Sequence, residues 1–490
     1  MSKKKKDDGI IISAIGNSLN DVTGSCWSIS YPKRNNERGL IMLECGLVQG
    51  DSTVEKSYNS NKAMLDKIGK DMVSSCEFLI LGHSHIDHVG NTPYFNDDNG
   101  FKGKILGSYK CIEIAKDLIK DSVFIHKRNI EYLNSIGKRV KPLFTEPQMY
   151  QMFEHMESQP IGEKIRLNEY ITIQFHNNNH VVGATSISIY IRKPNNTVSH
   201  ILYSSDMGSK ISQEMKPFLT DNEIPKKCNI FISEATYNSR ERGFTKKEAI
   251  EEREYLKKYI ETSLKNDKRI LFATFSFGRS QEILAFLYEK FKDEEWFREI
   301  PIVVDGLLVN NINNTYLKTL DEEDREYFKK ILSMENIKLN KGYDGTIAVL
   351  SKRTKGIYLA GSGFLQAGRI VTYLPQFLGS KNDCIILTGY SGGEGSLASK
   401  ILNTEQKTVS IEKQVVYKKA EVKQLKTWSS HIQYDELLKL FSQMHCDKIL
   451  VHHSDEHKEQ FCEEAKEYLK EKGITTPVIA VKKGCDQFVL

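Results

Sequence analysis

Apolar residues in the first half of the chain gather in short runs that are separated by turn residues. Runs of about 4 to 8 β-branched and aromatic residues between polar breaks are typical of strands. Residues 109–120 and 148–156 instead repeat apolar positions at helical spacing and predict helices. The predicted strands cover residues 10–15, 25–30, 40–43, 78–81, 170–176, 186–191 and 201–203. This mixture predicts stacked sheets with helices outside them.

From about residue 245 the pattern changes to long helices that alternate with apolar strands. Residues 246–265 and 279–292 predict helices, and residues 269–275 between them predict a strand. The runs "IPIVVDG" and "CIILTGY" are almost continuously apolar, as expected for strands that are buried on both faces of a parallel sheet. This part of the chain therefore predicts an α/β doubly wound domain.

The last stretch returns to a strand over residues 448–451, a helix over residues 455–472 and the closing apolar run "TPVIAV". We therefore divide the chain into three parts, residues 8–238, 239–426 and 427–490.

The composition is that of a globular protein and leaves several classes of function open. The chain has 490 residues, enough for large cores, with 39% hydrophobic and 27% charged residues. The formal charge of +5 permits a polyanionic substrate without requiring one. Nine scattered cysteines without a Cys-x-x-Cys pair argue against a disulfide framework and for a reducing compartment. Because no apolar run approaches the roughly 18–20 residues of a membrane span, we expect a soluble, cytoplasmic protein without membrane contact.

Three histidines and one aspartate follow the predicted strand at residues 78–81, in "LGHSHIDHVGN". Side chains of an extended chain alternate between two faces, so His83 and His85 point the same way and are able to hold one cation. Asp87 and His88 lie where the strand should turn into a helix, and they are able to reach a second cation. Imidazole and carboxylate together are ligands of zinc rather than of calcium or magnesium. The alternative, a polar loop whose histidines face water, does not explain the spacing.

Further ligands for such a site are isolated His and Asp residues that follow predicted strands. His180 lies in "NNNHVVGATS", Asp206 in "ILYSSDMGS", and either His452 or His453 in "KILVHHSDEH". Each alone has an ordinary explanation, because a single Asp at a strand end is often a turn former or helix cap.

Taken together, these residues resemble the motifs of the metallo-β-lactamase superfamily. The resemblance implies that His83, His85 and His180 bind a first zinc ion, and that Asp87 and His88 bind a second. It further implies that Asp206 bridges both zinc ions. For the closing histidine we choose His452, because it directly follows "KILV" as the family's histidine does.

Later motifs narrow the resemblance to the β-CASP nucleases of this superfamily. They include "ISEATYNSRER", "FATFSFGRSQEIL", "GSGFLQAGRIVTYL", "GYSGGEGSLASKIL" and "WSSHIQYDEL". The nearest patterns are those of stand-alone bacterial and archaeal β-CASP ribonucleases and of the endonuclease subunit of the pre-mRNA 3′-end cleavage factor. The resemblance implies an α/β fold, a metallo-β-lactamase αββα sandwich with an inserted β-CASP domain in residues 239–426.

The resemblance also implies an activity, hydrolysis of RNA phosphodiester bonds with two Zn²⁺ ions. Asp87 would assist the attacking water, His431 would protonate the leaving oxygen, and Glu234 would orient His431. A structural alternative for Glu234 and His431 is a buried pair at the domain junction. The implied partner is single-stranded RNA, and the family allows a homodimer.

Glycine-rich stretches at residues 361–368 and 389–395 are expected to present backbone N–H groups to phosphates. Arg279 and Arg369 would add phosphate contacts, with surface ion pairs as the alternative. One departure from the family pattern lies at Glu44, where the usual residue is Asp.

Three other functions remain open at this point. Some β-CASP relatives process DNA, although these usually carry an apolar residue where this chain has His452. Hydrolysis of a small nucleotide or thioester is a second alternative, and a metal-free scaffold subunit of an RNA-processing complex is the third.

Overall fold

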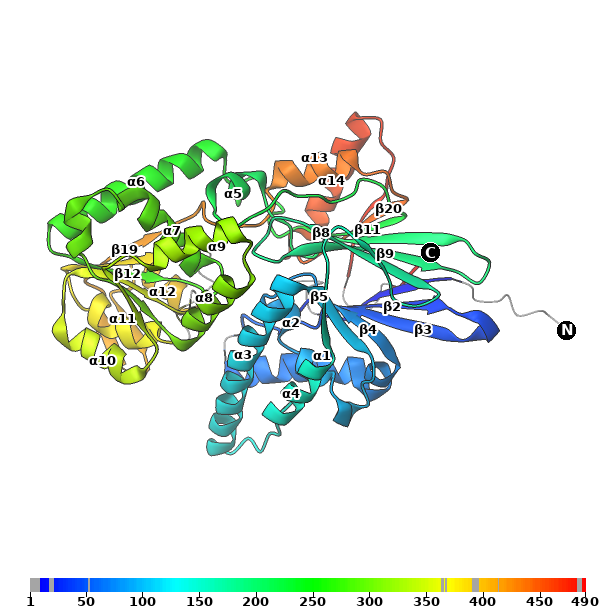
Figure 1. The fold of residues 1–490 in the computed structure, drawn as a ribbon, viewed down its shortest axis with the longest axis horizontal. Coiled ribbons are helices and arrows are strands. Elements are labelled where there is room, and N and C mark those ends of the chain that lie inside the picture. Colours follow the sequence, from blue (N-terminus) through cyan, green and yellow to red (C-terminus); the bar gives the residue numbers. More distant parts are fainter. Residues whose placement is uncertain are drawn as a thin grey trace. The chain divides into compact units, whose positions relative to one another are not determined.

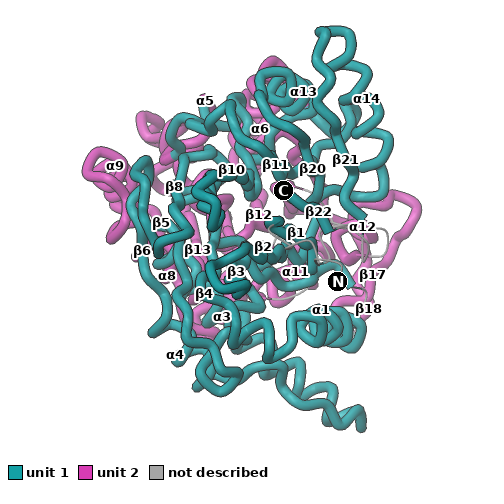
Figure 2. The backbone as a smooth tube through the Cα atoms, turned by 90° about the vertical axis from the view of Figure 1, so that its right-hand side faces the viewer, with its two compact units in different colours: residues 1–213, 219–243, 430–490 teal, residues 214–218, 244–429 magenta. Residues whose placement is uncertain are grey.

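The computed structural model describes residues 9–16, 22–51, 53–362, 365, 368–389, 396–412, 414–482 and 487–490. The chain forms two compact units (Figure 2). Unit 1 comprises residues 1–213, 219–243 and 430–490, and unit 2 comprises residues 214–218 and 244–429. The breaks at 243 and 429 lie close to the boundaries expected at 238 and 426.

Unit 1 contains two seven-stranded sheets. The first sheet has the order β22-β1-β2-β3-β4-β5-β6. Its strands are β22 (Gln487–Val489), β1 (Ile11–Ala14), β2 (Trp27–Pro32), β3 (Arg38–Leu43), β4 (Cys76–Ile80), β5 (Lys104–Ser108) and β6 (Met156–Gln159). The second sheet has the order β21-β20-β11-β10-β9-β8-β7. Its strands are β21 (Val478–Ala480), β20 (Lys448–His452), β11 (Ile230–Glu234), β10 (Val198–Tyr203), β9 (Thr185–Arg192), β8 (Ile171–Asn177) and β7 (Lys164–Arg166).

The two sheets of unit 1 pack against each other through one apolar core. Ile29 and Ile41 from the first sheet and Ile173, Ile189 and Ile232 from the second are fully buried in the same cluster. Each strand alternates inward and outward side chains, so the opposite faces of the two sheets are available to helices.

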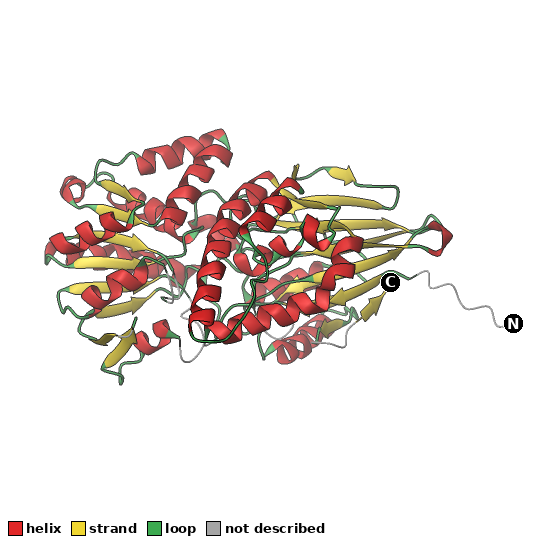
Figure 3. Cartoon of the chain, turned by 90° about the horizontal axis from the view of Figure 1, so that it is seen from below, coloured by secondary structure: helices red, strands yellow, loops and turns green. Residues whose placement is uncertain are grey.

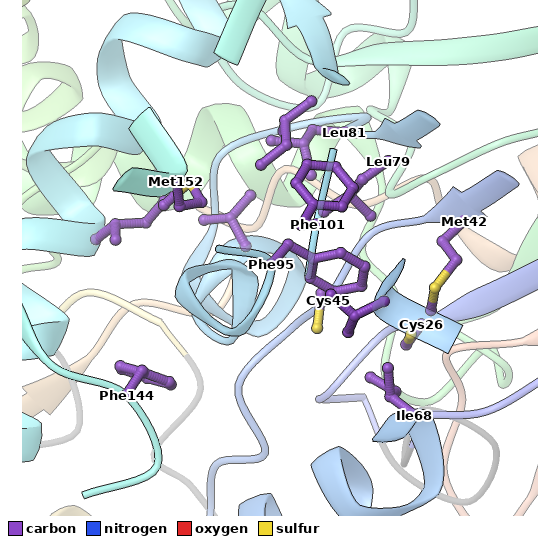
Figure 4. Close-up of a cluster of buried hydrophobic side chains, with 14 of the residues drawn as sticks. Cys26, Met42, Cys45, Ile68, Leu79, Leu81, Phe95, Phe101, Phe144 and Met152 are labelled. Atoms are coloured by element: carbon purple, nitrogen blue, oxygen red, sulfur yellow. The ribbon is translucent and has the colours of Figure 1, made fainter. Parts of the chain in front are cut away.

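Helices pack on the outer faces of both sheets in unit 1, over part of each face (Figure 1). The cluster outside the first sheet joins α1 (Val54–Ser75), α3 (Tyr109–Ser135) and α4 (Glu146–Glu154) to that sheet. Figure 4 shows part of it, including Phe95 and Phe101, whose rings meet edge to face at 5.4 Å. Outside the second sheet, α13 (Tyr434–Gln443) and α14 (Lys458–Glu471) bury Leu437 and Phe461 against β11 and β20. The layers are therefore αββα, as predicted.

Unit 2 is built on a six-stranded sheet of order β14-β13-β15-β12-β16-β19, whose strand pairs are all parallel. The strands are β12 (Arg269–Ala273), β13 (Ile302–Asp305), β14 (Ile337–Asn340), β15 (Gly356–Ala360), β16 (Asp383–Leu387) and β19 (Glu421–Gln424), with a separate hairpin of β17 (Thr408–Ile411) and β18 (Gln414–Tyr417). The helices are α6 (Lys246–Lys265), α7 (Arg279–Phe291), α8 (Leu307–Thr319), α9 (Glu322–Leu332), α10 (Tyr343–Lys352), α11 (Ile370–Leu378) and α12 (Leu397–Leu402). Figure 3 shows the helices and strands along the chain, coloured by type. The predicted α/β doubly wound pattern is confirmed.

Local chemistry explains which helices have the bounds predicted from the sequence and which do not. Helix α6 has the predicted bounds, because the Thr245 side chain accepts from the Glu248 N–H while Glu248 accepts from the Thr245 N–H, a capping box. Helix α3 continues beyond the expected residue 120 to Ser135, since Val123, Ile130 and Leu133 extend its buried face. Helix α1 was not predicted from its polar sequence.

None of the cysteines in the described residues forms a disulfide. In the part of the chain that the structure describes, no helix has the length and apolar character that crossing a membrane requires.

Candidate metal centre

The loop after β4 brings three imidazoles together in unit 1. The extended residues His83 and His85 lead into the one-turn helix α2 (Ile86–Val89), and His180 follows β8. His83 Nε2 lies 3.1 Å from His85 Nδ1, and His180 Nε2 lies 3.3 Å from the same His85 Nδ1. The structure therefore places all three predicted ligands of the first ion together.

These three nitrogens fit a tetrahedral zinc ion. Zinc–imidazole bonds of about 2.0–2.1 Å require neighbouring nitrogens roughly 3.3–3.4 Å apart, close to the spacing observed. Burial lowers the pKa of His85 to about 4 and holds the pKa values of His83 and His180 well below their ordinary range. Neutral imidazoles keep the lone pair that a metal requires.

A second cluster consists of Asp87, His88, Asp206 and His453. His88 Nε2 lies 3.2 Å from His453 Nε2 and 3.7 Å from Asp87 Oδ2. The Asp87 Oδ2 atom lies 3.6 Å from His453 Nε2. Two imidazoles and two carboxylates thus surround one position, and this donor set also suits zinc.

One carboxylate oxygen links the two clusters. Asp206 Oδ2 lies 3.6 Å from His83 Nε2, 3.8 Å from His180 Nε2 and 3.2 Å from His88 Nε2. Burial raises the pKa of Asp206, but the neighbouring His453 and His88 outweigh burial and hold the pKa well below its usual value. An ionised Asp206 is therefore shared by both clusters.

His453, and not the expected His452, joins the second cluster. His452 is the last residue of β20, and it points into the core between the sheets. Its ring meets Trp27 edge to face at 5.2 Å and stacks on Tyr203 at 5.5 Å. Within the described residues, neither of its ring nitrogens has a hydrogen-bond partner.

The difference arises because β20 is one residue longer than predicted. Side chains alternate along a strand, so His452 shares the inward face of Leu450, which belongs to the core between the sheets. His453 lies just beyond the strand with φ 46°, a left-handed conformation that is uncommon for a residue with a side chain. This turn of the backbone directs the His453 imidazole into the cluster.

A buried Glu44 holds two of the histidines in place. Its Oε2 accepts a hydrogen bond from His88 Nδ1 at 2.5 Å, and the Tyr203 hydroxyl donates to the same oxygen. Its Oε1 accepts from Ser205 Oγ at 2.7 Å, and Ser205 Oγ lies 2.9 Å from His83 Nδ1. Glu44 thus orients one histidine of each cluster, His88 directly and His83 through Ser205.

The close approach of Glu44 and Ser205 depends on Gly82. A Cβ atom at residue 82 would lie 2.3 Å from Ser205 Oγ and 2.9 Å from Glu44 Oε1. Similarly, a Cβ atom at Gly46 would lie 1.5 Å from the Asp87 carbonyl oxygen. Glycine at these two positions lets the loop carrying the histidines pack directly on the Glu44-Cys45-Gly46 segment.

Two hydroxyl residues that position histidines were missed by the sequence analysis. Thr236 Oγ1 lies 3.2 Å from His453 Nδ1, and Ser205 contacts His83 as described above. Serine and threonine after a strand have many ordinary roles, so the sequence carries no signal that separates these two from others.

His431 and Glu234 form the predicted pair beside the clusters. His431 Nδ1 lies 3.1 and 3.2 Å from the two Glu234 oxygens, and its ring lies 4.5 Å from that of His180. The Met207 and Thr236 N–H groups donate to Glu234 at 2.6 and 3.1 Å. Burial lowers the pKa of His431, but the Glu234 carboxylate more than offsets burial and holds the pKa above its ordinary value.

Solvent reaches this centre on the side of Asp87 and His431. The side chains of Asp87 and His431 are 19% and 21% exposed, whereas those of His83, His88 and Asp206 are 0–2% exposed. The side chains of Asp87 and His431 are therefore accessible from solvent.

The arginines expected to contact phosphates lie in unit 2 and have protein partners. Arg279 Nε lies 2.9 Å from Glu282 Oε2, and Arg369 Nε lies 3.6 Å from Asp305 Oδ1. Both arginines thus have carboxylate partners, and their contact with phosphates stays a prediction. Most of the glycine-rich stretches expected to bind phosphate lies outside the described residues.

Comparison with known proteins agrees with this geometry. Residues 280–401 match the Beta-Casp domain. Over 449 residues the chain is 25% identical to endoribonuclease ysh1 of Schizosaccharomyces pombe, covering 89% of this chain and 53% of that protein. It is 24% identical over 425 residues to ribonuclease TTHA0252 of Thermus thermophilus, covering 85% of this chain and 88% of that protein.

It is also 23% identical over 475 residues to Integrator complex subunit 11 of Gallus gallus, covering 94% and 72% of the two chains. The chain spans about half the length of the yeast endoribonucleases that it matches. A crystal structure of a protein of unknown function from Enterococcus faecalis V583 shares the fold, with a TM-score of 0.51, 12% identity and coverage of 98% of this chain and 100% of that one. The predicted resemblance to the β-CASP nucleases is confirmed.

Proposed function

We propose that this chain, which matches the Beta-Casp domain and resembles metallo-β-lactamase β-CASP nucleases, hydrolyses RNA phosphodiester bonds with two zinc ions. The observation that carries this proposal is the pair of clusters that share Asp206 Oδ2. The first ion would take His83, His85 and His180, the second would take Asp87, His88 and His453, and Asp206 would contact both. His453 replaces His452 in the predicted ligand set.

The choice of RNA rests on the relatives, which are named endoribonuclease and ribonuclease. His452 does not distinguish an RNA from a DNA substrate, because its side chain faces the core between the sheets. Cytoplasmic location and a homodimer stay predictions.

Two bound zinc ions would make a water acidic near neutral pH and neutralise charge that grows on the phosphate oxygens. Asp87, at the solvent side, is placed to accept a hydrogen bond from the attacking water. His431 donates a proton to the leaving oxygen from Nε2, while its Nδ1–H stays on Glu234. The Met207 and Thr236 N–H groups fix the Glu234 carboxylate, so the His431 ring is held in one tautomer.

The test is digestion of matched RNA and DNA strands by the purified chain and by Asp87→Asn and His85→Ala. We expect cleavage of RNA by the wild type only, with circular dichroism spectra that are unchanged in both variants. Substantial cleavage by Asp87→Asn would contradict the two-metal assignment, and preferential cleavage of DNA would favour the DNA-nuclease alternative. A chain that binds no zinc and cleaves neither strand would favour the scaffold alternative.

A further inference from the structure

The outer face of the second sheet is apolar on β10, β11 and β20 and becomes polar towards β7. On β10, β11 and β20, outward residues such as Leu202, Phe231 and Ile449 pack under α13 and α14. Farther along the sheet, β8 and β9 have their main contacts with neighbouring strands. Their outward side chains are polar and include the half-buried Thr172 and Tyr190. This part of unit 1 therefore presents a hydrophilic sheet face.

Strand register gathers cations around one aromatic ring on this face. The pairs Arg166↔Thr172, Thr172↔Tyr190 and Tyr190↔His200 form a row across β7, β8, β9 and β10. Arg192 lies next to this row and pairs with Val198, which is 51% exposed. A depression of about 260 Å³ is lined mainly by Lys164, Arg166, Thr172, Tyr190, Arg192 and Val198.

The Tyr190 ring is held firmly in this depression. The His200 ring stacks on it at 4.3 Å with an interplanar angle of 21°, and Lys164 Nζ lies 4.7 Å from the ring centroid. Ser188 Oγ lies 2.9 Å from both His200 Nε2 and His176 Nε2, which fixes His200 in turn. Burial lowers the pKa of His200 to about 4, so His200 contributes a neutral ring while the charge comes from lysine and arginine.

The charge of the lining favours a polyanion. Lys164, Arg166 and Arg192 contribute three cations, whereas Glu169 is the acidic residue of the lining. The volume is slightly below the roughly 300–1,000 Å³ of enclosed small-molecule sites. An open, shallow, cationic surface with an aromatic ring suits one part of an extended chain that crosses the sheet. Single-stranded nucleic acids are bound by this combination of charge and aromatic rings.

We propose that the depression around Tyr190 binds single-stranded RNA outside the metal centre. This proposal rests on the proposed ribonuclease function for the choice of polyanion. Strand β9 begins at Thr185, whose N–H donates to the Gly82 carbonyl beside His83, and Tyr190 lies five residues farther along β9. At about 3.4 Å per residue, the depression lies roughly 17 Å along β9 from the loop that carries His83. It shares no residue with the metal centre, and RNA held there would raise the affinity of the enzyme for long substrates.

The test measures binding of a fluorescent, unstructured oligouridylate to the full-length chain in zinc-containing buffer by anisotropy over a range of salt concentrations. The background variant Asp87→Asn keeps the RNA uncut. The double variant Arg166→Gln/Arg192→Gln removes two charges. As a matched control, Lys470→Gln/Lys472→Gln removes two exposed charges at the C-terminal end of α14. Because each phosphate contact contributes about 0.7 to the salt slope for a single strand, we expect the slope to fall by roughly 1.4 and affinity to fall roughly tenfold or more. The control should bind like the background chain.

A second pair of variants tests whether the Tyr190 ring contributes to RNA binding. Tyr190→Leu should weaken binding roughly tenfold through lost stacking, while Tyr190→Phe should bind normally. RNA affinity and salt slope that are unchanged in the arginine variant would overturn the proposal. An arginine variant that binds RNA normally but loses binding to polyglutamate would identify the face as a docking site for acidic protein instead, and would also overturn it.

Failure of this proposal is distinguishable from failure of the proposed function. With Asp87 intact, Arg166→Gln/Arg192→Gln should hydrolyse bis-p-nitrophenyl phosphate at the wild-type rate, because this small ester does not reach the depression. A wild-type chain that does not cleave RNA at all would contradict the ribonuclease, whereas the binding measurements report on the depression alone.

Discussion

The Glu44 carboxylate accepts a hydrogen bond from His88 Nδ1 at 2.5 Å, and it reaches His83 of the other cluster through Ser205. One buried side chain therefore orients a histidine of each cluster. The family usually has Asp at this position, one methylene shorter. In this chain the longer side chain and Ser205 fit together because residue 82 is glycine.

We therefore expect that the shorter side chain in Glu44→Asp cannot orient both His88 and His83. Loss of such orienting partners typically lowers metal affinity 10- to 100-fold, and we predict a loss in this range. Competition with a zinc-binding dye measures it. The exposed substitution Glu37→Asp is the matched control, and zinc affinity equal to that of wild type in Glu44→Asp would contradict the role of Glu44.

Substitutions of the adjacent residues His452 and His453 should differ in their effect on zinc content. His453→Ala should lose one zinc ion per chain, measured by elemental analysis, because His453 lies in the second cluster. His452→Phe should keep both ions, since a phenyl ring preserves the contacts with Trp27 and Tyr203.

His452→Ala should instead lower the free energy of unfolding by about 2–4 kcal/mol through a core cavity, measured by denaturant titration. Loss of zinc from His452→Phe with retention in His453→Ala would reverse the assignment of the two residues.

The sequence predicts the parts of the molecule that depend on local pattern. The alternation in "HSHIDH" places His83 and His85 together, and the strand ends before His180 and Asp206 bring these residues to the same centre. The α/β pattern of residues 246–292 likewise follows from helical periodicity and a capping box.

Other features depend on the three-dimensional fold. The choice between His452 and His453 depends on where β20 ends, and a strand end shifts easily by one residue in a sequence-based prediction. The contacts of Ser205 and Thr236 join elements that are far apart in the chain. Arg279 is a further example. Its Glu282 partner lies on the same helix, and the sequence does not show whether the guanidinium contacts this carboxylate or a phosphate.

His431→Ala should slow RNA cleavage roughly 10²- to 10⁴-fold, the usual contribution of a positioned general acid. Zinc content should stay at the wild-type value, since His431 is outside both ligand sets. Bis-p-nitrophenyl phosphate, whose leaving group needs no proton, should be hydrolysed almost as fast as by wild type. If both substrates lose the same factor, His431 is structural.

The pH dependence of RNA cleavage should report on the Glu234–His431 pair. Glu234 holds the pKa of His431 above its ordinary value, so the protonated acid persists to higher pH and the rate falls only above that pKa. Removing the negative charge in Glu234→Gln lowers this pKa and moves the alkaline limb of the kcat/KM profile to lower pH. A profile that keeps its alkaline limb in Glu234→Gln would show that another group protonates the leaving oxygen.

Zinc titration of the chelator-treated chain, with cleavage of end-labelled RNA as the readout, tests the two-metal ribonuclease most directly. Because Asp206 Oδ2 is shared by both clusters, we expect cleavage to appear as the second equivalent of zinc is added and to reach its maximum at two per chain. Full cleavage without added metal or at one equivalent, or no cleavage of RNA at two, would contradict the account.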